Sequence, residues 1–196
     1  MSAPLRARTP ASHFEALYES STDPWDYLSS AYESEKYAAT LAAIGPGPFA
    51  GALEVGCSIG IFSAMLAPRC GELVAMDFSA RALRLAGARL ADLANLELVQ
   101  GSFPEQAPER AWELVVCSEV LYYLDRPALA MALQWLRVQL AGGARVVVVS
   151  WRGPCTSEPL CGDEVHDMLV AELAAEHAFD GRSEGYRLDC FDRNER

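Results

Sequence analysis

The chain has 196 residues, of which 51% are hydrophobic, and this length suits one domain with a large buried core. Its formal net charge of −11 argues against a nucleic-acid partner, because phosphate backbones are bound largely by Lys and Arg. No run of 18 apolar residues and no apolar leader segment occurs, so we expect no membrane span, no secretory signal and a cytoplasmic location.

The six cysteines and three histidines are the residues that could bind a soft metal ion. The cysteines form no C-x-x-C pair, so we expect no zinc site. Cys57 and Cys117 lie in apolar strand contexts, which is typical of small core residues. We therefore expect reduced thiols and no bound metal.

The first part of the chain has the pattern of coil and short helices. Residues 1–12 combine Pro, Ser, Arg and Ala without periodicity, and we expect them to be disordered. Residues 13–21 and 34–44 show helical spacing. The Gly-Pro-Gly-Pro run at 45–48 is a strong break after the second helix.

From residue 45 to residue 196, apolar strands alternate with helices. This alternation indicates a parallel sheet with helices on both faces, which is an α/β fold. Strands are expected at 52–55, 72–77, 96–101, 112–118 and 144–150, with two weaker ones near 177–182 and 186–192; helices are expected after residue 60 and at 79–93, 127–140 and 163–176.

The stretch ALEVGCSIGIF at 52–62 fits two kinds of site. Gly56-x-Ser58-x-Gly60 matches the G-x-S-x-G nucleophile elbow of hydrolases, and it also matches the glycine-rich turn of a nucleotide-binding unit. The hydrolase alternative is disfavoured, because the turn follows the first strand and no HGGG-like oxyanion segment occurs. Its candidate bases, His166 and His177, lie in or beside a charged helix.

The nucleotide-binding alternative gains support from Asp77, which ends the second strand 21 residues after Gly56. A carboxylate there can accept both hydroxyls of a ribose, while Gly56 and Gly60 let the backbone approach the ligand. Glu54 precedes the turn and would repel a pyrophosphate, and Ile61 replaces the third glycine of dinucleotide sites. These features favour S-adenosyl-L-methionine, a cation without phosphate.

Six stretches carry a family resemblance: DPWDYLSSAYESEKYAATL, LEVGCSIG, LVAMDFSARAL, WELVVCSEVLYYL, GDEVHDML and YRLDCFDR. In these the chain resembles class I S-adenosylmethionine-dependent methyltransferases, and within them the nodulation N-methyltransferase (NodS) type. The resemblance implies a Rossmann-like, mostly parallel seven-stranded sheet with one antiparallel strand, and methylation of a sugar amine. One departure is Ser102, where the superfamily often has an acidic residue that holds the adenine amino group.

Residues at the carboxyl ends of the strands and in the N-terminal helices are expected to hold the cofactor, since this edge of a parallel sheet faces the ligand crevice. Helix capping, core packing and plain loops are the alternatives for individual members. The expected cofactor-binding residues are Trp25, Tyr37, Glu54, Gly56, Cys57, Ser58, Gly60, Asp77, Phe78, Ser79, Gly101, Ser102, Phe103 and Ser118.

Three side chains are expected to act on the acceptor: Glu119, Tyr123 and His166. Glu119 follows the fourth strand, at the ligand edge. His166 could take a proton from the acceptor, although a surface histidine on a helix is the commoner case. Tyr122 and Tyr123 are adjacent, so we expect one of them to face the crevice and the other to lie in the core.

The reaction needs alignment of the acceptor with the methyl group, and an amine acceptor must lose a proton before it attacks. The scarcity of histidine and the lack of an acid at Ser102 favour nitrogen over oxygen in a small-molecule acceptor. The alternatives are a small-molecule O-methyltransferase and a non-catalytic cofactor-binding module. The oligomeric state stays open.

The N-terminal segment is expected to be a lid. Residues 13–44 contain Trp25, Tyr27, Tyr32 and Tyr37, and these aromatic side chains need a surface to cover. Because the nearest candidate surface is the ligand edge of the sheet, we expect the segment to close over the cofactor and to become ordered when the cofactor binds.

Overall fold

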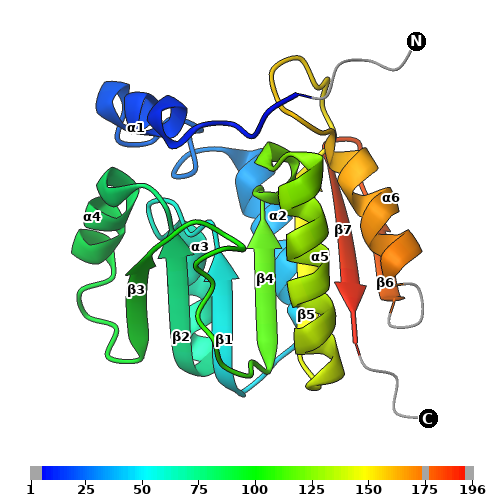
Figure 1. The fold of residues 1–196 in the computed structure, drawn as a ribbon. Helices are drawn as coiled ribbons and strands as arrows, with labels where there is room; N and C mark the ends of the chain where they lie inside the picture. The colour runs from blue at the N-terminus through cyan, green and yellow to red at the C-terminus, as the bar shows by residue number, and fades with distance from the viewer. Residues whose placement is uncertain (1–5, 174–176, 193–196) are drawn as a thin grey trace.

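A computed structural model of the chain describes residues 6–173 and 177–192, and a seven-stranded sheet runs through it (Figure 1). Each strand is a short, mostly apolar run, as expected for strands covered on both faces. The strands are β1 (Phe49–Val55), β2 (Cys70–Asp77), β3 (Leu96–Gln100), β4 (Leu114–Ser118), β5 (Arg145–Trp151), β6 (His177–Arg182) and β7 (Tyr186–Phe191).

The strand order is β3-β2-β1-β4-β5-β7-β6. The first five strands of this order pair in parallel, whereas β7 runs antiparallel to both β5 and β6. The order reverses between β1 and β4, and ligands of open α/β sheets bind at such a point. The predicted Rossmann-like sheet with one antiparallel strand is confirmed.

Six α-helices and two short 3₁₀ helices surround the described sheet. Three of them begin at a polar cap that the sequence provides: the side chains of Ser30, Ser79 and Asp125 each accept a backbone N–H of the first turn. The helices are α1 (Ala11–Ser20), α2 (Ala31–Ile44), α3 (Ile61–Leu66), η1 (Ala67–Arg69), α4 (Ala80–Arg89), η2 (Leu121–Tyr123), α5 (Arg126–Ala141) and α6 (Gly162–Glu172).

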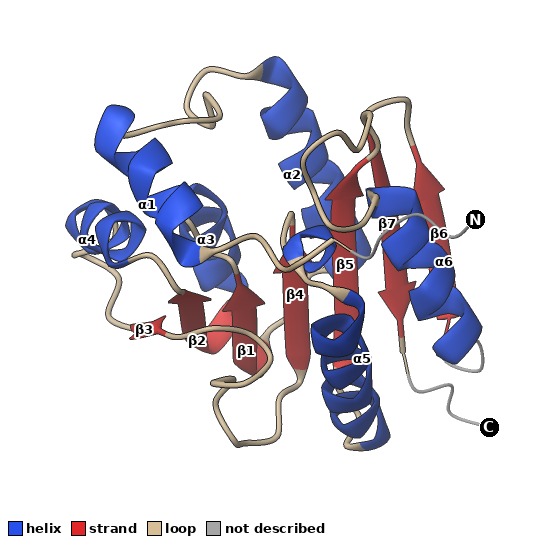
Figure 2. Ribbon diagram, turned by 45° about the horizontal axis from the view of Figure 1, so that its top comes forward, coloured by secondary structure: helices blue, strands red, loops and turns tan. Residues whose placement is uncertain are grey.

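The core has two layers, because successive side chains of a strand point to opposite faces of the sheet. Leu53 and Val115 belong to the layer under α5 and α6. Ala52 and Val116, their neighbours in sequence, belong to the layer under α2 and α3. Figure 2 shows these helix pairs on opposite sides of the strands. The sheet is therefore packed against helices on both faces, and this packing fixes the positions of the loops at its carboxyl edge.

The start of the chain is more ordered than its composition suggests. The Arg8 guanidinium donates to the Phe103 carbonyl oxygen at 2.6 Å, and the Thr9 N–H donates to the Tyr123 carbonyl oxygen at 3.0 Å. α1 then begins at Ala11. The expectation of disorder in residues 1–12 is therefore wrong for residues 6–12, and its first five residues lie outside the described part of the chain.

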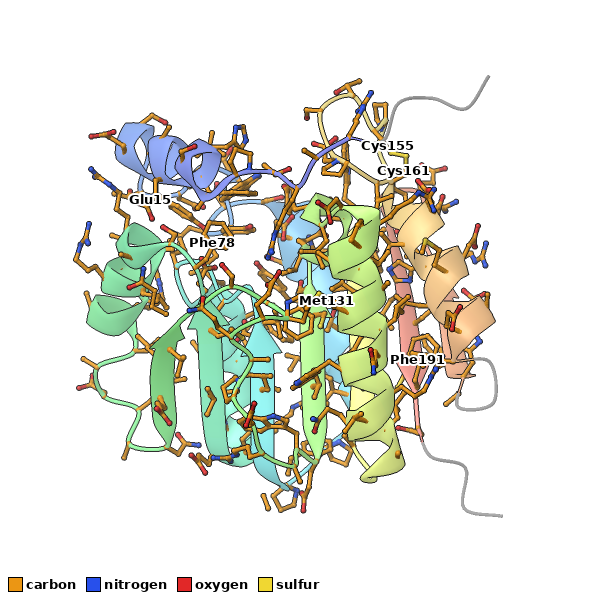
Figure 3. All side chains as sticks on the ribbon, in the orientation of Figure 1. Glu15, Phe78, Met131, Cys155, Cys161 and Phe191 are labelled. Carbon is orange, nitrogen blue, oxygen red and sulfur yellow. A yellow bond between two sulfur atoms is a disulfide. The ribbon has the colours of Figure 1, made fainter. Side chains whose placement is uncertain are left out.

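The loop between β5 and α6 contains a disulfide between Cys155 and Cys161 (Figure 3). The expectation of reduced thiols is wrong for this pair, because the loop folds back and brings the two Cα atoms to 5.3 Å. Cys57 and Cys117 are buried, as predicted. Within the described residues, no cluster of His, Cys, Asp or Glu could hold a metal ion, and no helix is long and apolar enough to cross a membrane.

Candidate active site

A cavity of about 440 Å³ opens at the carboxyl edge of the sheet, where the strand order reverses. Its walls come from the segment before α1, from α1, from the segment that joins α1 to α2, from the first two turns of α2, and from the loops after β1 to β5. Ten of its lining residues are aromatic. This volume lies within the range of roughly 300–1,000 Å³ that is usual for small-molecule sites.

The turn after β1 has three residues in the left-handed region: Gly56, Ser58 and Gly60, with φ of 81°, 51° and 80°. A Cβ on Gly56, which lines the cavity, would lie 2.2 Å from Cγ2 of Val120, so only glycine fits there. Gly60 does not line the cavity. A Cβ on Gly60 would lie 2.6 Å from Cδ1 of Leu90, in the segment after α4. The role of Gly60 is therefore close packing rather than the expected ligand contact.

Ser58 is held by two hydrogen bonds that leave the hydrolase alternative without support. Its hydroxyl lies 2.6 Å from the Tyr18 hydroxyl of α1, and its backbone N–H donates to Asp77 at 3.0 Å. No histidine of the described residues bonds to Ser58, so no general base accompanies it. The residue is instead a link between α1 and the glycine turn.

Asp77 ends β2 and lines the cavity. Its two carboxylate oxygens accept the backbone N–H groups of Ser58 and Ser79, at 3.0 and 2.9 Å. Burial raises the pKa of Asp77 to about 6, although these two N–H groups limit the rise. Each oxygen keeps a free lone pair, so the carboxylate can still accept a pair of hydroxyl groups.

The wall beside Asp77 is made largely by loops after β2 and β3. The Ser102 N–H donates to the Gln106 side chain at 2.8 Å, and no carboxylate stands at that position. The Ser79 hydroxyl caps α4 and does not line the cavity, so its expected ligand contact is corrected to a helix cap. The predicted residues that do line this wall are Phe78, Gly101, Ser102 and Phe103.

Glu54 is buried in β1, and its Oε2 atom has no hydrogen-bond partner within the described chain. Burial raises the pKa of Glu54 to about 7. It faces a second cavity of about 20 Å³, which Tyr37 and Cys57 also line and which shares Gly56 with the large cavity. A cavity of this size holds one water molecule, so contact between Glu54 and a ligand would run through water.

Some of the remaining predicted cofactor residues line a cavity, and others pack in the core. Trp25 lines the large cavity, and Ser118 lines both cavities. The Tyr37 ring packs on Phe62 with 5.3 Å between centroids and belongs to the core layer under α2. Phe78 lies beneath α1, where its ring meets Phe14 at 5.0 Å (Figure 3).

Glu119 lines the cavity, but both of its carboxylate oxygens already accept hydrogen bonds. Oε1 accepts from Lys36 Nζ at 2.6 Å, and Oε2 accepts from the Tyr122 hydroxyl at 2.8 Å and the Trp151 N–H at 2.9 Å. Lys36 also donates to Glu33 at 2.9 Å. Sequence reasoning missed both α2 residues, Glu33 and Lys36, because charged side chains on a helix usually face solvent.

Tyr122 belongs to the buried core, as expected for one of the two tyrosines, but Tyr122 and Tyr123 both line the cavity, so the expectation that only one of them faces the crevice is wrong. The 3₁₀ turn of η2 makes this possible, because it places adjacent rings side by side, with 4.4 Å between centroids. Tyr122 is buried and bonded to Glu119, whereas Tyr123 is partly exposed.

His166 does not reach the cavity, which corrects its expected catalytic role. Its side chain is fully buried, and its Nδ1 lies 2.5 Å from Oδ2 of Asp189 on β7. His177 lies 2.6 Å from Oδ1 of the same carboxylate, and Arg187 donates to Oδ2 at 2.9 Å. Helix α6 turns His166 toward the sheet, so His166 is neither a catalytic nor a surface residue.

Comparisons with known proteins agree with this geometry. The sequence profile of the family described as Nodulation protein S (NodS) matches residues 16–158. Nodulation protein S of Rhizobium tropici is 35% identical over 132 residues, which are 66% of this chain and 56% of that protein. The Sinorhizobium fredii protein is 32% identical over 127 residues, 64% of this chain and 59% of that one. The chain thus spans little more than half the length of these curated relatives.

The fold is also that of a solved relative. The crystal structure of N-methyltransferase NodS from Bradyrhizobium japonicum, in complex with S-adenosyl-L-homocysteine, superposes with a TM-score of 0.77 at 23% identity, over 93% of this chain and 98% of that one. At this identity the likeness shows the fold alone, which is the class I methyltransferase fold. Because the profile covers most of the chain, from α1 to the loop after β5, this protein belongs to the NodS family.

Proposed function

We propose that the protein is an S-adenosyl-L-methionine-dependent methyltransferase that acts on the nitrogen of a small-molecule amine. The observation that carries the proposal is the meeting of the Asp77 carboxylate and the Gly56 turn in one aromatic cavity at the switch point of the sheet. Membership of the NodS family supports the same activity, since the Bradyrhizobium japonicum member is an N-methyltransferase in complex with S-adenosyl-L-homocysteine.

The residues present fit this cofactor. Asp77 offers two acceptor oxygens for ribose hydroxyls, and Phe78 and Phe103 offer apolar walls for a purine. Glu54, with its orphaned Oε2, faces the water-sized cavity and suits an ammonium group. The cavity lining holds four carboxylates and two basic side chains, so its charge balance suits a cation and disfavours a phosphate.

The bound cofactor would supply a methyl group on a sulfonium, which is open to in-line attack. The residues of the chain align the acceptor with the methyl group and shield the reacting groups from water. Aromatic faces of α1 and of the α1–α2 segment can contact a cationic centre, worth about 0.5–2 kcal/mol when desolvated. The firm sheet edge holds acceptor and donor groups at fixed distances, and alignment of this kind contributes roughly 7–11 kcal/mol to such reactions.

The acceptor end of the cavity carries Glu33, Glu119 and Lys36, a carboxylate-rich set that favours an amine over a neutral hydroxyl compound. An amino sugar is one candidate acceptor. The proposal includes a cytoplasmic location and excludes a nucleic-acid substrate, and the net charge of −11 supports the second point.

The same proposal divides residues 13–196 into two parts. Residues 45–196 form the methyltransferase domain, and residues 13–44 contribute a lid over it. Two observations support a lid: Phe14 and Tyr18 of α1 line the cavity, and so do Trp25 and Tyr27 of the following segment.

Calorimetric titration with S-adenosyl-L-methionine and S-adenosyl-L-homocysteine tests the cofactor. We expect dissociation constants in the low-micromolar range or tighter. Folded protein that binds neither compound would refute the proposal. A panel of amines and matched alcohols, with release of S-adenosylhomocysteine as the readout, then separates N-methylation from O-methylation. Binding without release on any acceptor would indicate a non-catalytic cofactor-binding module.

A further inference from the structure

Two carboxylates and one ammonium group are packed together at the β4–β5 end of the cavity. Lys36 Nζ lies 2.9 Å from Glu33 Oε1 and 2.6 Å from Glu119 Oε1. The lysine side chain is 1% exposed, and its Nζ lies over the Tyr32 ring, 5.1 Å from the centroid. The cluster is therefore a built feature of the cavity wall and not a solvated surface pair.

This cluster lies apart from the carboxylate that is proposed to bind ribose. Glu119 follows β4, whereas Asp77 ends β2, and β1 runs between these two strands. Strands are spaced about 4.8 Å apart, so the two strand ends are separated by roughly 10 Å. The cluster thus belongs to a different part of the cavity from the ribose position.

The charges of the cluster do not balance. Within residues 6–173 and 177–192, Lys36 is the only cationic side chain bonded to either Glu33 or Glu119. Two carboxylates against one ammonium leave one formal negative charge in a buried place, which is costly unless a cation joins it. A ligand with an ammonium group would complete the set.

The two carboxylates differ in what they can still bind. Glu119 accepts three hydrogen bonds, shared between both of its oxygens. Glu33 uses Oε1 for Lys36, and its Oε2 is buried without a hydrogen-bond partner in the described chain. Glu33 also lines the large cavity. Its free oxygen is the unfilled acceptor position of the cluster.

We propose that Glu33, rather than Glu119, binds the ammonium group of the methyl acceptor and takes the proton that its nitrogen must lose. This inference rests on the proposed function. One N–H bond of the ammonium breaks, its proton moves to Oε2, and its electron pair stays on nitrogen. That pair then forms the N–C bond while the C–S bond breaks and leaves its electrons on sulfur. Glu33 finally releases the proton to water.

The surroundings of Glu33 suit a base. Burial raises the pKa of Glu33, Lys36 lowers it, and the charge of Glu119 raises it again. The Tyr37 hydroxyl is near enough to lower the pKa as well, although it makes no hydrogen bond to Oε2. The titratable groups that face Glu33 are Tyr32, Lys36 and Tyr37 of α2, Tyr27 of the preceding segment, and Glu119 after β4.

The first test needs neither turnover nor the natural acceptor. The ¹³C NMR signal of the Glu33 carboxyl group, assigned by its loss in Glu33→Gln, is titrated with pH in methylammonium chloride and in tetramethylammonium chloride at equal ionic strength. We expect the carboxyl group to titrate at lower pH in methylammonium, because N–H donors stabilise its charged form. Identical titrations in the two salts would overturn the proposal.

The second test uses glucosamine and benzylamine as primary-amine probes. In Glu33→Gln we expect kcat/KM at neutral pH to fall by about 100-fold or more, with recovery at alkaline pH, where the amine is already neutral. Glu35→Gln is the matched control, because Glu35 lies exposed on the same helix, and it should behave as wild type. An alkaline-rescued loss in Glu119→Gln, with Glu33→Gln unaffected, would assign the role to Glu119 and refute the proposal.

Cofactor affinity separates this inference from the proposed function. We expect S-adenosylmethionine and S-adenosylhomocysteine to bind Glu33→Gln and wild type alike. A selective loss of S-adenosylmethionine binding would show that Glu33 serves the sulfonium, and the assignment to the acceptor would be wrong. Failure of wild type to bind either compound would count against the proposed function, while the methylammonium titration would still decide the role of Glu33.

Discussion

The two N-terminal helices line the same cavity, but they are held to the molecule in different ways. α1 buries Phe14 and Tyr18 in a small cluster at the ligand edge. α2 buries Tyr37, Leu41 and Ile44 in the core layer on one face of the sheet. Figure 1 shows α1 above the edge beside α4, whereas α2 lies behind the strands.

The ion pairs of the two helices also differ in burial. α1 is tied to Arg81 of α4 through Glu15 and Glu19, and these pairs are exposed. α2 is tied to the loop after β4 through Lys36 and Glu119, a pair with almost no exposure on the lysine. We infer that α1 and the following segment are the movable part of the expected lid, and that α2 is a fixed wall.

The largest effect is expected from Lys36→Met. Removing the cation leaves two buried carboxylates without their partner, so the free energy of unfolding should fall by about 3–5 kcal/mol. Urea denaturation measures it. Arg81→Met of α4 is the matched control for the ionic contacts of α1, and loss of the exposed pairs with Glu15 and Glu19 should cost about 0–1 kcal/mol. Equal losses in the two variants would remove the distinction between the helices.

Asp77→Asn tests the side of the cavity that lies beneath α1. We expect S-adenosylhomocysteine binding to weaken by about 1.5–3 kcal/mol, since charge-assisted hydrogen bonds to the ligand are lost. Burial raises the pKa of Asp77 to about 6, and Glu15 of α1 adds to the rise. Wild-type affinity should therefore be full above pH 6 and fall as the pH drops through 6. A wild-type pH profile as flat as that of the variant would refute the role of Asp77.

Hydrogen exchange with and without S-adenosylhomocysteine tests the lid directly. We expect amides in residues 11–30 to gain about tenfold protection, because few buried contacts hold this segment before the ligand adds its own. Amides of α2 should exchange alike in both states. Asp77→Asn at the same ligand concentration is the control. Equal protection of residues 11–30 in both states would show that α1 is docked permanently.

The smallest effect is expected at the hydrogen bond between Tyr18 and Ser58, 2.6 Å long, which joins α1 to the glycine turn. Tyr18→Phe and Ser58→Ala should each lower the free energy of unfolding by about 0.5–1.5 kcal/mol, and less than additively together. Ser58→Ala should also keep most methyltransferase activity. A folded but inactive Ser58→Ala protein would restore the nucleophile hypothesis.

Local patterns in the sequence determined much of the fold and one side of the site. Strands predicted from apolar runs and helices predicted from 3.6-residue spacing are present, because both patterns report which face of a segment is buried. Gly56 as a turn residue follows from its own backbone chemistry. The position of the Asp77 side chain at the ligand edge was predictable, because Asp77 is the last residue of a strand.

Only the tertiary structure decided which distant side chains share a buried space. Lys36 meets Glu119 across 83 residues, and His166 meets Asp189 across 23. The sequence around Lys36 and His166 does not reveal these pairs, because a charged or polar residue on a helix is expected to be exposed to solvent. Strand order and helix docking bring such residues together, and burial then forces them to pair. For this reason the sequence predicted Asp77 and Glu119 at the ligand edge of the sheet, while Lys36, which pairs with Glu119 and Glu33, emerged only from the fold.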